Sequence, residues 1–275
     1  MDSIAVIILN YMTWQETLKE VDAVRTVLKN HPYEIIIVDN HSPNESAEKL
    51  SQAADGSFTF LNADRNDGYA AGNNVGLRYA FKKGHTYAWI LNNDIEFTDP
   101  EVLDKMLAVF TKGELIAAVT PDVYSPDGYL FNRDAIKPTL WDYTFGMIAY
   151  KKRGRAEKEA QKGWLYIYRP QGCCMLLDLS KVAEVGFMDE YTFLYYEEVI
   201  LAERLLQKNY RCACCSATKI IHNHSYTVRK ALSKLKYVQS NLRSFDYYLK
   251  QYRQYHWPSR LLCDGFCALK VFILP

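Results

Sequence analysis

The sequence of 275 residues lacks several features that would place it in a specialised class of protein. No apolar run reaches the roughly 18 residues of a transmembrane helix, and the nearest stretch, 261–274, is interrupted by Asp264 and Lys270. The net charge of +1 provides no basic excess, so a nucleic-acid partner is not expected. With 49% hydrophobic and 24% charged residues, the chain has the composition of a folded protein, and its length predicts one large core with a tail.

A regular cysteine framework is also missing. The seven cysteines are an odd number and include two adjacent pairs, which favours free thiols in a reducing compartment over a disulfide scaffold. No second CxxC pair accompanies Cys212, Cys214 and Cys215, so we interpret them as buried strand residues rather than zinc ligands. The N-terminal stretch has no basic region and no cleavage site of a signal peptide. A cytoplasmic location is therefore expected.

Strand-like and helix-like stretches alternate in the first third of the chain. The apolar patterns predict strands at 4–9, 34–38, 58–62 and 88–91, and helices at 14–29, 46–54, 72–83 and 100–112. This repeat predicts an α/β fold with a Rossmann-like, mainly parallel central sheet flanked by helices. Ligands of such sheets bind beyond the carboxyl ends of the strands, where Asn10, Asp39 and Asp94 fall.

The pattern is weaker in the second half. Turn-forming residues, many aromatic residues and a charged run at 151–162 predict an insertion or mobile loop over 121–169. Order is expected to return at 171–178, 180–185 and 187–208. A last strand at 219–221 precedes His222 and His224.

Three polar residues, Asn92, Asn93 and Asp94, follow the strand predicted at 88–91. A carboxylate and an amide oxygen two positions apart can face one divalent cation, and hard oxygen ligands suit Mg²⁺ or Mn²⁺ carried by a diphosphate. Taken alone, the same residues are more typical of a polar turn at the end of a strand. Neighbouring motifs favour the cation site.

Two further segments suggest a nucleotide site. Asp39 ends a predicted strand, where a carboxylate can accept hydrogen bonds from a pyrimidine imide or a ribose, although a helix cap is the alternative interpretation. The stretch 65–77 places Gly68, Gly72 and Asn73 before an apolar helix, which predicts a tight turn with backbone amides close to a ligand. No Gly-Lys-Ser/Thr follows, so this is not a Walker loop.

Six segments in order resemble glycosyltransferase family 2, and within it the bacterial rhamnosyltransferase-like branch: NY at 10–11, VDNHS at 38–42, RNDGYAAGNN at 65–74, LNND at 91–94, GCCM at 172–175 and FMDEYTFLYYEEVILAERL at 187–205. The resemblance covers residues 3–226. It implies a GT-A fold, a nucleoside-diphosphate-sugar donor and inversion at the anomeric carbon. We therefore expect a catalytic domain at 1–226, with a nucleotide-sugar half at about 1–120 and an acceptor half at about 121–226, and a helical tail at 227–275.

The resemblance also implies roles for individual residues. The positions that match the donor site are Asn10, Tyr11, Asp39, Asn66, Gly72, Asn73, Asn92, Asn93 and Asp94. Asn92 replaces the first aspartate of the family's DxD-type motif, which keeps an oxygen ligand but removes one negative charge. The predicted metal ligands are Asn92, Asp94 and His222, with His224 as the alternative histidine, and the predicted cofactor is Mn²⁺ or Mg²⁺.

The family's acidic motif, YEDVDL, corresponds to residues 196–201. Here Glu198 stands at the position of the usual base, and Ile200 replaces a second carboxylate. Glu198 is the predicted catalytic base and Glu197 the alternative, since inversion needs a base within about 3 Å of the acceptor hydroxyl. Two acids at the positive end of a helix are also an ordinary structural feature. Gly172 and Cys173 match the acceptor-side segment.

The predicted reaction moves rhamnose or a hexose from dTDP-rhamnose or a UDP-hexose to a glycan or lipid-linked saccharide acceptor. The family's setting is bacterial cell-surface polysaccharide synthesis, including capsule and cell wall. Two alternatives remain. The changes at Asn92, Glu198 and Ile200 would suit a non-catalytic nucleotide-sugar-binding protein. A sugar nucleotidyltransferase usually has an N-terminal glycine-rich loop, and residues 1–20 contain no glycine.

Basic and aromatic residues alternate along the segment 229–260. This composition predicts one or two helices that contact an anionic membrane peripherally, at the inner face of the cell membrane. The alternative is an amphipathic helix packed against the catalytic domain or against a second subunit in a homodimer.

Overall fold

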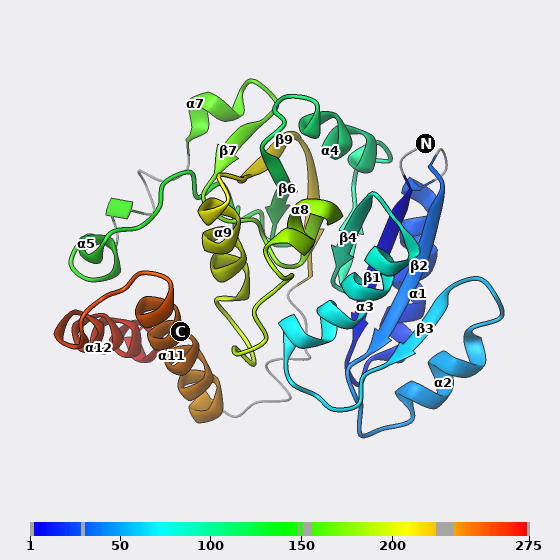
Figure 1. Ribbon diagram of the computed structural model, residues 1–275, viewed down its shortest axis with the longest axis horizontal. Helices are drawn as coiled ribbons and strands as arrows, with labels where there is room; N and C mark the ends of the chain where they lie inside the picture. Colours follow the sequence, from blue (N-terminus) through cyan, green and yellow to red (C-terminus); the bar gives the residue numbers. More distant parts are fainter. Residues whose placement is uncertain (1–2, 29–30, 148, 151–155, 224–233, 274–275) are drawn as a thin grey trace.

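The computed structural model describes residues 3–28, 31–147, 149–150, 156–223 and 234–273 (Figure 1). Its strands are β1 (Ile4–Asn10), β2 (Tyr33–Asp39), β3 (Thr59–Asn62), β4 (Tyr87–Leu91), β5 (Ile95–Phe97), β6 (Ile116–Tyr124), β7 (Leu165–Ile167), β8 (Cys174–Asp178) and β9 (Arg211–His222). Its helices are α1 (Trp14–Val27), α2 (Ser46–Ala53), α3 (Tyr69–Lys83), α4 (Val102–Phe110), α5 (Leu140–Tyr143), α7 (Glu157–Ala160), α8 (Leu179–Glu184), α9 (Glu197–Gln207), α11 (Lys234–Gln251) and α12 (Trp257–Ile273).

The described strands form one mixed sheet in the order β3-β2-β1-β4-β8-β6-β9-β5, with β7 paired to β9. The pairs β1–β2, β1–β4 and β2–β3 are parallel, as the alternating pattern of the first third predicts. Beyond β4 both directions occur, because β8 runs antiparallel to β4 and β6 while β9 runs parallel to β6. The α/β fold class is confirmed, with the parallel pairing concentrated in the N-terminal half.

Both faces of the sheet are covered by helices, which explains the continuous apolar run of β1. Ile4, Val6 and Ile8 point into a core that also contains residues of α1, α2 and α4. Ala5 and Ile7 point into the opposite core, with residues of α3, α8 and α9. Strands buried on both faces are hydrophobic at every position rather than at alternate ones. All five side chains are fully buried.

The prediction of an insertion or mobile loop over 121–169 is wrong at both ends of that range. Strand β6 continues to Tyr124 inside the sheet, and β7 pairs with β9. Pro121 and Asp122 resemble a turn in the sequence, but here they lie at a register shift between β6 and β9. Proline is tolerated at such an irregularity because no ladder hydrogen bond is required of it. Strand β9 is also longer than the three residues predicted.

The seven cysteines are free, and Cys212, Cys214 and Cys215 are buried on β9, as interpreted from the sequence. Among the helices that the structure describes, none combines the length and the apolar character needed to span a bilayer.

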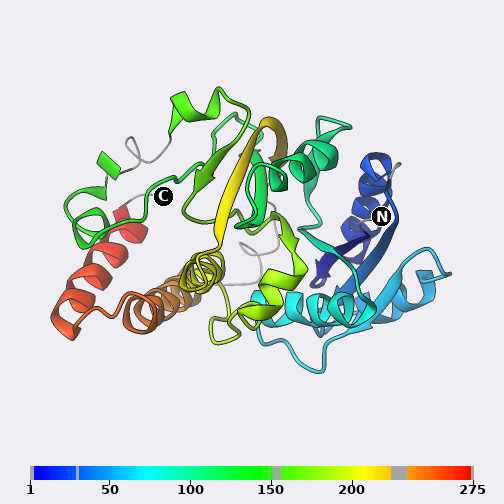
Figure 2. The same ribbon diagram turned by 45° about the horizontal axis from the view of Figure 1, so that its top comes forward.

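The tail helices lie beside the acceptor half and far from the N-terminal strands (Figures 1 and 2). Their buried residues Phe245, Tyr248, Leu249 and Cys263 form a separate cluster with Ile200 of α9. Helix α11 therefore packs against the catalytic domain, which was one of the alternatives predicted for the tail. The predicted domain boundary at 226/227 lies outside the described residues.

Candidate active site

The carboxyl ends of β1 and β2 are joined by a hydrogen-bonded cluster around Asp39. Asn10 pairs with Asp39 in the parallel register, and its Nδ2 donates to Asp39 Oδ1 at 2.6 Å. The Ser42 hydroxyl donates to the same oxygen at 2.7 Å, and the Ser42 amide donates to Oδ2 at 2.8 Å. Asp39 is fully buried, so these donors replace its lost hydration.

Asn93 connects this cluster to the end of β4. Its Nδ2 lies 2.8 Å from the hydroxyl oxygens of both Thr13 and Thr17, and Thr17 in turn donates to Asn10 Oδ1 at 2.8 Å. The predicted nucleoside site at Asp39 and the predicted cation site after β4 are thus parts of one hydrogen-bonded layer. Tyr11 lies half-buried at the end of β1.

The loop before α3 is held by amide side chains. Asn66 Oδ1 accepts from Asn40 Nδ2 and from the Gly68 amide, both at 3.1 Å. Gly68 has a φ of 101°, and a Cβ here would lie 2.1 Å from the carbonyl oxygen of Phe193. Only glycine fits this position, because both the backbone conformation and the contact exclude a side chain.

Gly72 and Asn73 are buried inside α3. A Cβ at Gly72 would lie 2.7 Å from Leu9 Cδ1, so the residue allows α3 to approach β1 closely. Asn73 Nδ2 donates to the Tyr69 carbonyl within the same helix at 2.9 Å. These contacts give both residues a packing role, and their contact with a donor stays a prediction.

Asn92, Asp94 and His222 converge at the point where β4, β5 and β9 meet. His222 Nε2 lies 3.1 Å from Asp94 Oδ1 and 3.3 Å from Asn92 Nδ2. Asp94 is followed by β5, whose first residue, Ile95, pairs with His222 in the antiparallel ladder. The register of the sheet therefore brings together residues 130 positions apart.

The donor set fits a divalent cation that arrives with a diphosphate. A carboxylate, an amide oxygen and an imidazole are ligands that Mn²⁺ and Mg²⁺ accept, and phosphate oxygens would complete the shell. Asn92 contributes no charge, and the described part of the chain holds no group of three or more His, Cys, Asp or Glu residues that could bind a metal ion. A cation bound here would depend on the negative charge of the ligand.

Tyr69, which was not among the predicted site residues, links the cation cluster to the acceptor side. Its hydroxyl lies 3.1 Å from Asn92 Oδ1 and 2.8 Å from the Gly172 carbonyl oxygen. Burial and the nearby Glu197 raise its pKa well above the usual value, so the hydroxyl keeps its proton. The residue belongs to the RNDGYAAGNN motif, but its position in that motif does not indicate that its side chain crosses to Gly172.

Glu198 lies directly beside Gly172. The Gly172 amide donates to Glu198 Oε1 at 3.1 Å, and a Cβ at Gly172 would approach that oxygen to 2.7 Å. Cys173 is buried next to them, and its carbonyl oxygen accepts from the Asn92 amide at 2.9 Å. Gly172 and Cys173 thus touch both the base candidate and the cation cluster.

Glu197 occupies a different environment from Glu198. It is buried, and its Oε2 makes no hydrogen bond with the described residues. Burial first and the negative charge of Glu198 second raise the pKa of Glu197 well above its usual range. A raised pKa makes Glu197 a poor proton acceptor, whereas Glu198 is held at Gly172 by a hydrogen bond, so Glu198 stays the base candidate.

Glu20 is a further buried acid that the sequence prediction did not include. It lies on α1, and its Oε2 accepts from the Ile95 amide, next to Asp94. Burial raises its pKa to about 8, against a weaker opposite effect of the Ile95 hydrogen bond, and the charge of Asp94 raises it further. In the sequence, only its position on the apolar side of the helix predicted at 14–29 indicated that Glu20 is buried.

The turn that precedes the two acids is strained. Tyr195 and Tyr196 have φ values of 70° and 68°, and Tyr196 is the residue before the first turn of α9. Left-handed backbone costs roughly 1–2 kcal/mol for each residue that has a side chain. Two such residues in succession, beside a predicted catalytic group, require support from surrounding contacts.

Comparisons with known proteins identify the family of this chain. The model of glycosyl transferase family 2 matches residues 3–180. The low-salt glycan biosynthesis hexosyltransferase Agl10 of Haloferax volcanii is 23% identical over 224 residues, which are 81% of this chain and 68% of that protein. The N-acetylglucosaminyl-diphospho-decaprenol L-rhamnosyltransferase of Mycobacterium tuberculosis is 24% identical over 153 residues, which are 50% of this chain and 48% of that protein.

Among solved structures, the mannosyltransferase PcManGT from Pyrobaculum calidifontis, in complex with GDP-Man and Mn²⁺, has a TM-score of 0.63. It is 13% identical, and the match covers 98% of this chain and 70% of that one. A likeness of this kind supports the GT-A fold. Since the family model covers more than half of the sequence, the chain belongs to glycosyl transferase family 2, a family of glycosyltransferases.

Proposed function

We propose that the protein transfers a sugar, rhamnose or a hexose, from a nucleoside-diphosphate donor to a hydroxyl of a glycan or lipid-linked acceptor, with inversion, in cell-surface polysaccharide synthesis. One observation carries this proposal. A continuous path of contacts runs from Asp94 through His222, Asn92, Tyr69 and Gly172 to Glu198. The predicted cation ligands and the predicted base therefore border one site.

On the donor side, Asp39 and Asn10 would hold the nucleoside, with Tyr11 and Asn66 at the rim. The diphosphate would lie at Asn92, Asp94 and His222, which would hold Mn²⁺ or Mg²⁺, and such a cation would offset the charge of the departing group. The similar mannosyltransferase was solved with GDP-Man and Mn²⁺, which supports a nucleotide-sugar donor and a divalent cation for this protein. The contact of Asn93 with Thr17 keeps the two halves of the donor site in register.

On the acceptor side, Glu198 would remove the proton of the attacking hydroxyl. The acceptor oxygen then bonds to the anomeric carbon on the face opposite the diphosphate, and the bond from that carbon to the diphosphate oxygen breaks. The Gly172 amide holds one oxygen of Glu198, which fixes the direction of the carboxylate. Glu197, buried and protonated, would serve the packing beneath it.

A non-catalytic nucleotide-sugar-binding protein is the second candidate, since Asn92 and Ile200 depart from the family's acidic pattern. The position of Ile200 weakens this alternative. Its side chain is fully buried against Phe245 and Tyr248 of the tail, where a carboxylate would be costly. Packing against the tail therefore explains the replacement.

A panel of donors tests the proposal: dTDP-rhamnose, UDP-glucose, UDP-galactose, UDP-N-acetylglucosamine and GDP-mannose, each with and without Mn²⁺. A ligand at about 100 times its dissociation constant stabilises a fold by roughly 2.7 kcal/mol, which a thermal-shift measurement detects. Hydrolysis of the stabilising donor should release a sugar of inverted anomeric configuration, visible by proton NMR before mutarotation. Donor binding with no turnover would instead support the non-catalytic protein.

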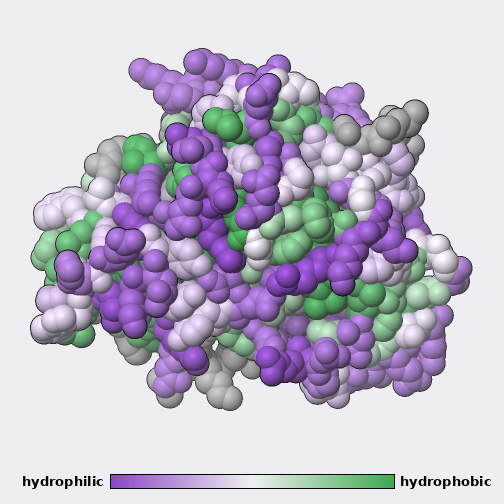
Figure 3. All heavy atoms as spheres, viewed as in Figure 1, coloured by the Kyte–Doolittle hydropathy of each residue, from purple (hydrophilic) through white to green (hydrophobic). Residues whose placement is uncertain are grey.

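The tail adds a peripheral contact with the membrane to this proposal. Helix α12 and the segment around α5 expose Trp257, Leu261, Trp141 and Phe145, each by 60% or more. Some hydrophobic residues lie between polar ones at this edge of the molecule (Figure 3), and a surface groove of about 430 Å³ lies along Leu261, Leu262 and Leu269 of α12, among other residues. Such a face suits the headgroup region at the inner side of a membrane.

Vesicles test this contact directly. Sedimentation with anionic vesicles should be lost in the double variant Leu261→Asp, Leu269→Asp and kept in Lys82→Ala, a change of one exposed charge on α3, outside the tail. Equal binding by the double variant would exclude α12 as the contact and leave packing of a second subunit as the other use of this face.

A further inference from the structure

The strained turn before α9 is covered by the tail. The Tyr196 ring stacks on Phe245 at a centroid distance of 5.0 Å and on Tyr248 at 5.7 Å, with interplanar angles of 21° and 25°. The Ser244 hydroxyl donates to the Leu194 carbonyl at 2.9 Å. Helix α11 therefore touches the turn on both its ring and its backbone.

The same helix also holds the segment that leads into the turn. Tyr247 stacks on Tyr191 at 3.8 Å, and its hydroxyl donates to Asp189 Oδ2 at 2.9 Å. Tyr252, just after α11, donates to the same oxygen. Segment 189–196 has no secondary structure that spans it, so these side chains provide much of its support.

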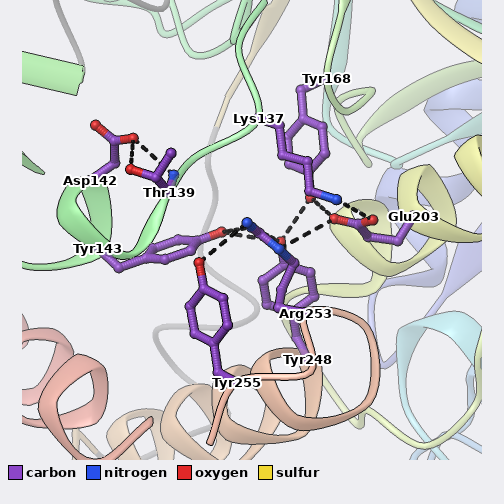
Figure 4. A network of polar contacts seen from close by, with 9 residues as sticks. All are labelled: Lys137, Thr139, Asp142, Tyr143, Tyr168, Glu203, Tyr248, Arg253 and Tyr255. Carbon is purple, nitrogen blue, oxygen red and sulfur yellow. Dashed lines mark hydrogen bonds and ion pairs between the residues drawn. The ribbon is translucent and has the colours of Figure 1, made fainter. Parts of the chain in front are cut away.

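A polar network fixes the tail in turn (Figure 4). Tyr248 lies 2.8 Å from the Tyr168 hydroxyl, which donates to the buried Glu203 of α9 at 2.5 Å. Arg253 donates to the Tyr248 hydroxyl at 3.0 Å and lies 3.8 Å from Glu203. The tail therefore contacts α9 at two places. The rings of Phe245 and Tyr248 pack on Tyr196 just before the helix, and Arg253 pairs with the buried Glu203 within it.

We propose that α11 positions the catalytic base: Phe245 and Tyr248, packed on Tyr196, hold the left-handed turn at 195–196 and thereby direct Glu198 toward Gly172. This proposal rests on the proposed function. Without the rings, the turn would relax toward ordinary backbone geometry and α9 would begin in a different direction. Glu198 would then lose its hydrogen bond from the Gly172 amide. The hydrogen bonds of Asp39 and Asn93 on the donor side would be kept. Tyr196, Phe245 and Tyr248 are positioning residues in this account.

The test compares Phe245→Leu and Tyr196→Leu with Tyr196→Phe, which keeps the ring, and with Lys250→Ala, a control at an exposed position of α11. Both leucine variants should lower the turnover number of donor hydrolysis roughly 10- to 100-fold, as expected for a displaced catalytic group. The KM for the donor should stay unchanged, and Tyr196→Phe should retain the turnover that Tyr196→Leu loses. Equal turnover in all four variants, or a rise in KM that accounts for the loss, would overturn the proposal.

Hydrogen–deuterium exchange provides a readout that does not need activity. The Ile200 amide bonds to the Tyr196 carbonyl at 2.9 Å, so exchange in peptides spanning 194–200 should become faster in the leucine variants while peptides from β1 and β2 do not change. If the wild type hydrolyses no donor, the proposed function fails whatever the exchange result. If it does hydrolyse a donor and exchange at 194–200 is unaltered by Phe245→Leu, the positioning role fails alone.

Discussion

The two sides of the site are built by different means. On the donor side, polar side chains at neighbouring strand ends are linked by hydrogen bonds. Asn10 donates to Asp39, and Asn93 is linked to Asn10 through the hydroxyl of Thr17. On the acceptor side, Glu197 is buried next to Glu198, and the turn before them is left-handed. Support comes there from aromatic residues of the distant tail.

This difference separates two kinds of preorganisation. The donor side is fixed by strand register, so a change in one side chain leaves the others close to their positions. The acid side stores unfavourable energy in a buried carboxyl and in backbone strain, which surrounding packing must offset. We therefore expect donor binding to be robust and base positioning to be sensitive to substitutions far from the substrate.

On the donor side, removing the charge of the cation cluster should have the largest effect. Asp94→Ala leaves Asn92 and His222 without a carboxylate, so cation-dependent stabilisation by the donor should disappear and turnover should fall roughly 100- to 1,000-fold. Asn92→Asp is the matched change in the opposite direction and should tighten binding of Mn²⁺ in the presence of donor. Full turnover by Asp94→Ala would remove the cation from the account.

Gly172→Ala tests the acceptor side with a single methyl group. The new Cβ would lie 2.7 Å from Glu198 Oε1, and this flexible side chain can move away. We expect thermal stability within about 0.5 kcal/mol of the wild type and turnover lower by roughly tenfold, with donor affinity kept. A loss of stability without a change in turnover number would show that Gly172 serves packing alone.

Glu20→Gln probes the buried acid beneath the donor side. The folded protein raises the pKa of Glu20 to about 8, so the folded state holds a proton that the unfolded state loses above its own pKa of about 4.5. Stability from this group is therefore present at low pH and lost as the pH rises from about 4.5 to about 8. The glutamine variant lacks this loss, and its advantage should grow by about 1.4 kcal/mol per pH unit in that window.

Urea denaturation at pH 5.5, 6.5 and 7.5 measures this advantage. Curves for the two proteins that shift in parallel over this range would show that Glu20 is not protonated in the folded state.

The sequence predicted the donor side better than the acid side for a physical reason. Strands β1 to β4 have apolar runs and polar ends that are local in the chain, so the residues from Asn10 to Asp94 could be assigned to one edge of a sheet. The role of Tyr69 depends on Gly172, which is 103 positions away. No local pattern contains that contact.

The same reasoning applies to the strands and the tail. The end of strand β6 was predicted as part of a loop because turn-forming residues at 125–128 follow it, and its pairing with β9 across the register shift after Pro121 is visible only in the assembled sheet. The tail was interpreted from its basic and aromatic composition as a membrane contact. Its packing on Tyr196 depends on which face of α11 meets α9, and that follows only from the assembled fold.

The most direct test of the central claim compares two neighbouring variants, Glu198→Gln and Glu197→Gln, in hydrolysis of the donor that stabilises the fold. Both substitutions keep the shape of the side chain and remove its acid. The account predicts that Glu198→Gln loses roughly 100- to 10,000-fold in turnover number while donor affinity is kept, and that Glu197→Gln remains close to the wild type. The reverse order, or full activity in both variants, would contradict the assignment of Glu198 as the base.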